Sequence, residues 1–248
     1  MPLNRFRGPH VFVGDLEHPE LDGGDLHHLS RVRRLRVGDV LTAGDGEGAW
    51  RVCRFTGRAS LDPVGPVAHE TRPQPSLVIG FALVKGSKPD LVVQKLTEIG
   101  IDVIMPFVAD HSVVRWDDVK SDRNVQRWRL VARQAAMQSK RAWLPSVMPV
   151  EPFADAVAHS TVSTRSSGDW EPVEALPGPN DIRRARADLG GPPLPVTVHV
   201  LFIGPEGGWS ERERQLLPDA ASLGPHVLRA ETAAIVAGAL LVAHHRTG

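Results

Sequence analysis

The hydrophobic pattern of this chain changes at residues 71–76, and the change restricts the chain to few folds. Upstream, short strand-like stretches are separated by Gly-Asp turn signals. Downstream, apolar runs alternate with helical patterns, which predicts a mostly parallel α/β sheet. Prolines within 71–76 disfavour helix at the residues before them, so an extended linker is expected there. The 248 residues therefore divide into two expected domains, a small β-barrel or sandwich at 1–72 and an α/β domain at 77–248. The strand-like stretches of the first domain are 11–13, 40–42 and 50–55.

The second domain is expected to begin with a buried strand and a helix. Pro89 suits the first turn of this helix, and Gly100 can end it. The last helix is apolar nearly all round, so we expect it in a core or a subunit interface. A stretch at 166–195 is rich in proline, glycine and charge and is expected to form a long surface excursion. The expected strands are 77–84, 103–107 and 198–203, and the expected longer helices are 122–143 and 232–244.

An apolar strand that runs into a glycine-rich turn is the strongest local signal for a ligand site. The strand ends at Ile203, residues 204–208 form the turn, and Ser210 with Glu213 predicts a capping box for the next helix. Glycines let the backbone approach a ligand closely, and ligands of open α/β sheets bind beyond the carboxyl ends of strands. Alone, such a turn is more often an ordinary connection. Its spacing matches neither an ATP-binding loop nor a dinucleotide fingerprint.

A second signal lies at 223–233, where a short strand, Val227-Leu228, is expected to open into the last helix. This arrangement places Arg229 and Glu231 at the mouth of the helix. Alone, the pattern indicates a helix start in which Glu231 interacts favourably with the macrodipole and Thr232 supplies a cap.

Basic residues gather on the expected long helix, although the chain as a whole has 29 basic and 29 acidic residues. Between Arg123 and Arg141 there are six basic residues and no acidic one. A charged stripe is usually a solvated face, but the lack of acids makes contact with phosphate at least an equal alternative.

Several motifs in one fixed order are together specific. They are Lys85, 94–100, 133–141, 203–208 and 228–233, with a basic run at 27–39 in the first domain. In this order they resemble the family that methylates N3 of a uridine in small-subunit ribosomal RNA, the ribosomal RNA small subunit methyltransferase E family of the SPOUT superfamily. The resemblance covers most of the chain and is poor only at 164–195.

The resemblance implies an α/β SPOUT domain tied in a trefoil knot, a PUA-like RNA-binding β-barrel at the N-terminus, and a homodimer. It also implies that S-adenosylmethionine binds in a pocket made by 201–208, 226–233 and the loop following Thr161-Val162-Ser163. The expected cofactor contacts are Leu201, Ile203, Gly204, Pro205, Glu206, Gly207, Gly208, Val227, Leu228, Ala230, Thr232 and Ala233.

The implied reaction transfers a methyl group from S-adenosylmethionine to N3 of a specific uridine in 16S ribosomal RNA, within the small subunit. Because uracil N3–H is a weak acid, we expect Arg229 and Glu231 to be the catalytic residues. Arg229 would stabilise charge on the uracil oxygens, and Glu231 or Glu206 would act as base, although Glu231 can instead pair with Arg229 and shape the loop. The expected RNA contacts are Arg31, Arg33, Arg34, Lys85, Lys88, Lys95, Arg133, Gln134, Gln138 and Arg141.

Two other functions stay open at this point. One is a SPOUT methyltransferase acting on another ribosomal or transfer RNA position, and the other is a non-catalytic RNA-binding or ribosome-assembly protein. The single cysteine, Cys53, excludes an internal disulfide, and the histidines show no metal-ligand spacing. The longest apolar run, 233–243, is too short to cross a bilayer. We therefore expect a cytoplasmic protein with neither a metal nor a membrane partner.

Overall fold

The computed structural model divides the chain into two compact units. The first unit is Met1–Pro73 with Arg133–Leu144, and the second is Gln74–Ala132 with Pro145–Gly248. The boundary between Pro73 and Gln74 falls inside the expected linker. The described residues are 3, 6–84, 88–114, 116–160 and 183–246.

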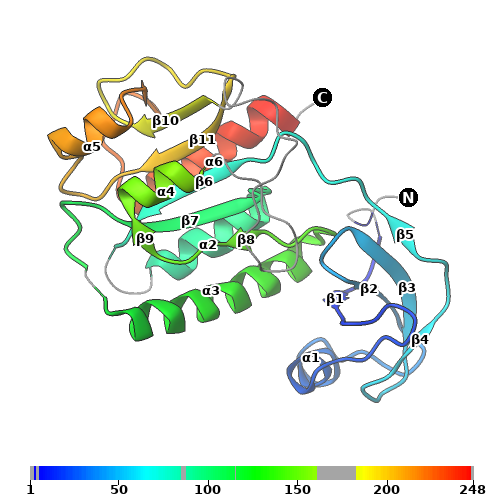
Figure 1. Ribbon diagram of the computed structural model, residues 1–248. Coiled ribbons are helices and arrows are strands. Elements are labelled where there is room, and N and C mark those ends of the chain that lie inside the picture. Colours follow the sequence, from blue (N-terminus) through cyan, green and yellow to red (C-terminus); the bar gives the residue numbers. More distant parts are fainter. Residues whose placement is uncertain (1–2, 4–5, 85–87, 115, 161–182, 247–248) are drawn as a thin grey trace. The chain divides into compact units, whose positions relative to one another are not determined.

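The first unit contains a five-stranded sheet (Figure 1). Strand β1 pairs parallel with β2, whereas β2, β3 and β4 are antiparallel neighbours and β5 pairs antiparallel with β3. Alternate residues of these strands, among them Val11, Leu41 and Cys53, are buried in one core. The three expected strands are confirmed to within two residues. The bounds are β1 (His10–Phe12), β2 (Val40–Gly44), β3 (Ala49–Phe55), β4 (Leu61–Pro63) and β5 (Ala68–His69).

The expectation of strands alone in the first domain is wrong for 23–32. These residues form helix α1 (Gly23–His27) and the π-helix η2 (His28–Val32). Asp22 caps α1, since its side chain accepts a hydrogen bond from the Asp25 N–H at 2.6 Å. These helices are too short to show a hydrophobic periodicity in the sequence, and only Leu29 of η2 is buried.

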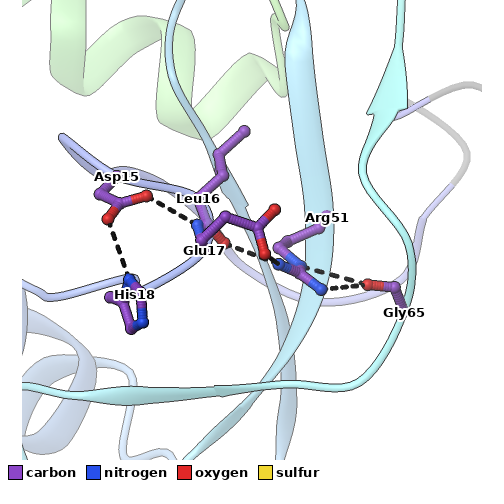
Figure 2. A network of polar contacts seen from close by, with 6 residues as sticks. All are labelled: Asp15, Leu16, Glu17, His18, Arg51 and Gly65. Atoms are coloured by element: carbon purple, nitrogen blue, oxygen red, sulfur yellow. Dashed lines mark hydrogen bonds and ion pairs between the residues drawn. The ribbon is translucent and has the colours of Figure 1, made fainter.

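The guanidinium of Arg51 on β3 joins two loops of the first unit, as Figure 2 shows. It donates to the carbonyl of Leu16 at 2.8 Å and to that of Gly65 at 2.7 Å, and it lies 3.3 Å from the carboxylate of Glu17. The side chain of Arg51 is only 13% exposed, so these carbonyls satisfy a largely buried charge. The network fixes both loops onto an inner strand of a small sheet.

The second unit is built on a seven-stranded sheet in which every neighbouring pair is parallel. The strand order is β12-β10-β11-β6-β7-β8, with β9 also pairing with β7. The parallel sheet expected from strand–helix alternation is therefore confirmed. The strand bounds are β6 (Val78–Ala82), β7 (Val103–Val108), β8 (Ser146–Val147), β9 (Glu151–Pro152), β10 (Arg183–Ala187), β11 (Val198–Ile203) and β12 (Ala220–Ala221).

Helices cover both faces of this sheet (Figure 1). On β6, Ile79 and Phe81 point into the core shared with α2, α3 and α6, whereas Val78 and Ala82 point into the core shared with α4 and the end of α5. This alternation is the period of two that a strand buried on both faces requires. The helix bounds are α2 (Lys88–Ile99), α3 (Asp118–Ser139), α4 (Phe153–His159), α5 (Glu211–Leu216) and α6 (Ala230–Arg246).

Three expectations need correction here. Helix α3 begins and ends four residues earlier than expected, and Lys140 follows it with a φ of 55° that cannot continue a helix. Val227-Leu228 is not a strand, because these residues form an irregular segment in which Val227 is 84% exposed. Strand β10 and the residues after it occupy the end of the expected surface excursion, whose part up to 182 lies outside the described residues.

Candidate active site

A cavity of about 390 Å³ lies beyond the carboxyl ends of the neighbouring parallel strands β10 and β11. Three chain segments line it: 187–189 after β10, residues within 203–214 after β11, and residues within 223–233 leading into α6. Its volume is within the range of about 300–1,000 Å³ usual for small-molecule sites. Its position is the one that open α/β sheets use for ligands.

Most of the expected cofactor contacts line this cavity. Three do not: Leu201 is buried in the core, Gly207 lies against His111, and Thr232 is exposed outside the lining. The expected contacts found in the lining are Ile203, Gly204, Pro205, Glu206, Gly208, Val227, Leu228, Ala230 and Ala233.

The third segment of the lining was not found from the sequence. The loop expected there, after Thr161-Val162-Ser163, lies outside the described residues, whereas the cavity is lined by Ala187, Asp188 and Leu189. The Asp188 carboxylate forms an ion pair with Arg214, and both side chains line the cavity. A Gly-Gly-Pro turn at 190–192, just after this segment, is the one sequence signal that marks the end of a strand here.

Tryptophan packing holds the glycine-rich turn after β11. The Trp209 ring is buried and stacks on Phe107, with ring centres 6.0 Å apart, and its indole N–H donates to the Ala187 carbonyl at 2.8 Å. A Cβ added at Gly204 would lie 2.8 Å from the Trp209 ring, so glycine is required here by packing. Gly208 has a φ of +73° with open space around it, so its requirement is conformational. The capping box of Ser210 and Glu213 is confirmed.

Lys88 connects the two loops from a third element, the start of α2. Its ammonium nitrogen lies 3.3 Å from Glu231 Oε1 and 3.6 Å from Glu206 Oε1. The Glu231 side chain is 13% exposed and does not line the cavity, and its Oε2 is buried with no hydrogen-bond partner among the described residues. Partial burial works to raise the pKa of Glu231, but its own backbone N–H, the Lys88 ammonium and the nearby charge of Arg229 together lower it. A carboxylate that faces Lys88 and has a lowered pKa is a poor base.

Arg229, in contrast, is exposed and lines the cavity. Within the described part of the chain, its guanidinium has no hydrogen-bond or ion-pair partner. Lys88, and not Arg229, makes the close contacts to Glu231 and Glu206 in the described part of the chain, and the Arg229 charge acts on Glu231 only from farther away. The guanidinium is therefore available to a ligand or a substrate.

The expected RNA contacts differ in whether their side chains are exposed and free to bind RNA. Arg133 forms two short contacts with Asp25 and donates to the Phe12 carbonyl at 3.0 Å, which gives it a structural role inside the first unit. Lys95 pairs with Glu98 at 2.7 Å. Arg141 is half-buried, and Lys85 lies outside the described residues. The exposed ones are Arg31, Arg33, Arg34, Gln134 and Gln138.

Comparison with known proteins gives two family matches. The RNA methyltransferase domain family matches residues 71–242, and the RNA methyltransferase PUA domain family matches residues 21–60. The chain is 32% identical to ribosomal RNA small subunit methyltransferase E of Mycobacterium tuberculosis over 235 residues, which cover 88% of this chain and 83% of the relative. It is 31% identical to the protein of that name from Bacillus subtilis over 226 residues, or 88% and 86% of the two chains.

The fold is also that of a solved structure. The crystal structure of a ribosomal RNA small subunit methyltransferase E from Neisseria gonorrhoeae bound to S-adenosyl methionine superposes with a TM-score of 0.76 at 22% identity. The superposition covers 96% of this chain and 98% of that one. A PUA domain followed by a parallel α/β domain with this pocket defines an RNA methyltransferase. The chain belongs to the ribosomal RNA small subunit methyltransferase E family.

These findings confirm the predicted family and the predicted fold class, a PUA-like domain followed by an α/β domain. The trefoil knot stays a prediction, since strand pairing alone does not define how the chain is threaded. In the described part of the chain no helix is long and apolar enough to cross a bilayer, and no three or more His, Cys, Asp or Glu side chains gather as metal ligands would.

Proposed function

We propose that the protein transfers a methyl group from S-adenosylmethionine to N3 of one uridine in 16S ribosomal RNA, as a cytoplasmic homodimer acting on the small subunit. One observation supports this most strongly. An unpaired arginine, Arg229, stands in the lining of a cavity at the carboxyl ends of parallel strands, in a chain of this RNA methyltransferase family.

The cavity fits S-adenosylmethionine in size and in chemistry. Apolar side chains from two segments, among them Ile203, Leu228 and Ala233, can contact the adenine ring. The backbone of the turn around Gly208 and the Asp188 carboxylate supply donors and acceptors for the polar parts of the molecule. When bound, S-adenosylmethionine supplies a methyl group on a positively charged sulfur, the electrophile that a nitrogen lone pair can attack.

The protein must place uracil N3 and manage its proton. We assign Arg229 to the uracil oxygens, where negative charge develops as N3–H is lost. Both glutamates face Lys88, at 3.6 Å for Glu206 and 3.3 Å for Glu231. For the base we favour Glu206, because it is exposed and lines the cavity whereas Glu231 is largely buried outside the lining. In this scheme Lys88 and Glu231 hold the loops and do not meet RNA.

Binding of RNA is assigned to exposed basic residues of the first unit. One of these arginines lies within η2 and two follow it, and none of them forms an ion pair with an acidic residue in the described part of the chain. Phosphate contacts need only a local basic surface. The surface consists of Arg31, Arg33 and Arg34.

A dimer is supported by the outer face of α6. One face of this helix is buried in the core through Ala233, Ala237 and Leu241. The other face has no charged residue between Thr232 and Ala243, and it leaves Ala239 exposed and Leu240 half-exposed. A second copy of the chain would remove this apolar stripe from water.

Mass-spectrometric mapping of 16S ribosomal RNA from cells that lack the gene tests the proposed function. Loss of one N3-methyluridine, restored by the wild-type gene and not by an Arg229→Ala gene, is the expected result. Loss of a methyl group elsewhere in ribosomal or transfer RNA would give the enzyme another target. A calorimetric titration with S-adenosylmethionine that shows no binding would instead support a non-catalytic RNA-binding protein.

A further inference from the structure

The loop after β7, residues 109–112, is fastened to the segment that follows the glycine-rich turn. Glu213 of α5 is fully buried and bonds to both. Its Oε1 accepts from the Asp110 N–H at 2.9 Å, and its Oε2 accepts from the Ser210 N–H at 2.9 Å. Because both carboxylate oxygens are satisfied by backbone donors from different segments, a buried charge holds the two segments together.

Asp110 adds a second connection at the surface. Its carboxylate accepts from the Ser210 hydroxyl at 2.6 Å and from the Arg212 guanidinium at 2.7 Å. The Arg212 guanidinium and the Ser210 hydroxyl hold the pKa of Asp110 below its usual value. We call the four residues that make these bonds, together with the neighbouring His111, the clasp: Asp110, His111, Ser210, Arg212 and Glu213.

His111 is the member of the clasp that touches the glycine-rich turn itself. Its Nδ1 lies 3.1 Å from the Gly207 carbonyl oxygen and 3.1 Å from the Gly208 carbonyl oxygen. Carbonyl oxygens only accept hydrogen bonds, so Nδ1 must carry a hydrogen whether the ring is neutral or protonated. The contact is close, because a Cβ added at Gly207 would lie 2.9 Å from the His111 Cβ.

By fixing the orientation of these two carbonyls, His111 also fixes the direction of the N–H group that follows each of them. In a planar trans peptide the N–H is directed opposite to the preceding carbonyl, so the Trp209 N–H points away from His111. Gly208 and Trp209 line the cavity, whereas His111 contacts the turn from outside the lining. Among the described residues the Trp209 N–H has no hydrogen-bond partner. It is therefore a donor that is free to bind a ligand, on the side of the turn opposite His111, in a residue that lines the cavity.

We propose that His111 is a positioning residue for the cofactor, which presents the Trp209 N–H to an acceptor atom of S-adenosylmethionine by holding the Gly207 and Gly208 carbonyls. The inference rests on the proposed function, since the ligand is the proposed methyl donor. It adds a residue from a different strand and loop to a site otherwise made of 187–189, 203–214 and 223–233.

Two variants of equal shape test whether position 111 needs a hydrogen-bond donor or only a side chain of this size. Asparagine at 111 can place its amide nitrogen near the position of Nδ1 and donate, whereas aspartate has the same shape but only accepts and repels the carbonyls. In calorimetric titrations with S-adenosylmethionine, His111→Asp should weaken binding about tenfold or more, and His111→Asn should stay within about threefold of wild type. Methylation assays should show a raised KM for S-adenosylmethionine with little change in kcat. His18→Asp, at an exposed histidine of the first unit, is the matched control and should bind as wild type does.

His111 is exposed, so its variants should keep the wild-type unliganded melting temperature, and His111→Leu replaces the aspartate variant if that variant fails to fold. Equal loss of affinity in the asparagine and aspartate variants, or no loss in the aspartate and leucine variants, would overturn the role of His111 while leaving the proposed function intact. No binding to the wild-type protein would refute the proposed function, and the role of His111 with it.

Discussion

Replacing Arg229 by alanine should slow single-turnover methylation about a hundredfold and leave the affinity for S-adenosylmethionine within about threefold. The structure explains why the rate should fall while the affinity is kept. The guanidinium is exposed and has no partner among the described residues, so its removal breaks no ion pair and leaves no buried charge uncompensated. Its one assigned interaction is with charge that develops on the uracil oxygens. Loss of one such stabiliser costs about 2.7 kcal/mol or more in the transition state, which is a factor of about one hundred.

The assay pairs calorimetry with S-adenosylmethionine and single-turnover transfer of a labelled methyl group to 16S ribosomal RNA. Arg229→Lys is the matched control, because it keeps the charge but loses the planar fork, and an intermediate rate is expected. If the affinity for S-adenosylmethionine falls in step with the rate, the side chain holds the cofactor loop and the catalytic assignment fails. A rate equal to that of wild type would remove Arg229 from the mechanism altogether.

Four further outcomes are expected. Gly208→Ala should weaken binding of S-adenosylmethionine in a folded protein because of its φ of +73°, whereas Gly204→Ala should mainly lower the unliganded melting temperature, because its Cβ meets the core. Burial lowers the pKa of His10 to about 4, so the unfolded chain takes up the proton first as the pH falls below 6.5. The unfolding free energy of the first unit should then fall by up to about 3 kcal/mol between pH 6.5 and 4, a loss that denaturation curves should not find in His10→Gln. Light scattering should find a dimer at low micromolar concentration and a monomer for Leu240→Glu, and a monomeric wild-type protein would contradict the proposed assembly. Glutamine at three arginines should weaken RNA binding and flatten its salt dependence, with cofactor affinity unchanged, as salt titrations would show. These arginines are Arg31, Arg33 and Arg34.

Features that depend on a few neighbouring residues could be predicted from the sequence. Strand β11, the glycine-rich turn and the capping box of Ser210 and Glu213 follow one another within 198–213, and the structure confirms each. Gly100 ends α2 with a φ of +113° for the same local reason. The cavity lies where parallel topology puts ligand sites, so strand–helix alternation was enough to locate it.

Strand β10 could not be predicted because its sequence, Arg-Arg-Ala-Arg-Ala, has the charge of a surface segment. Its arginines are accommodated by carbonyls that come from elsewhere in the chain. Arg184 donates to the Val157 carbonyl at 2.9 Å, and Arg186 donates to the Pro218 carbonyl at 2.7 Å. Only such distant acceptors let a basic strand lie between two others, and they leave no mark on the local pattern. Because β10 was not predicted, the segment 187–189 at its end was not predicted to line the cavity either.

The sequence could not show which basic residues of 123–141 already have acidic partners. This stretch has no acidic residue of its own, but the acids that pair with two of its arginines lie far away in the sequence. Arg127 pairs with Asp90 at 2.6 Å, and Arg133 pairs with Asp25 within the first unit. A truncation that removes residues 1–73 would also remove Asp25 from Arg133, so it would be a poor test of RNA binding. Substitution of exposed arginines leaves this pair intact.

A basic side chain can act on RNA or substrate only if no carboxylate already neutralises it, and this condition distinguishes Arg229 from the cations around it. Lys88, beside the cavity, lies against Glu206 and Glu231, and Arg214, the other arginine in the lining, lies against Asp188. Because Lys88 makes the close ion pairs with Glu206 and Glu231, the Arg229 guanidinium is left without a direct partner among the described residues and can bind a ligand. Lys88→Met should therefore act indirectly: it frees both glutamates to pair with Arg229 and should slow methylation although Lys88 touches no substrate in this scheme. Arg229→Ala in the Lys88→Met background should then cost less than in wild type, and a double-mutant cycle with no coupling would refute this division of charge.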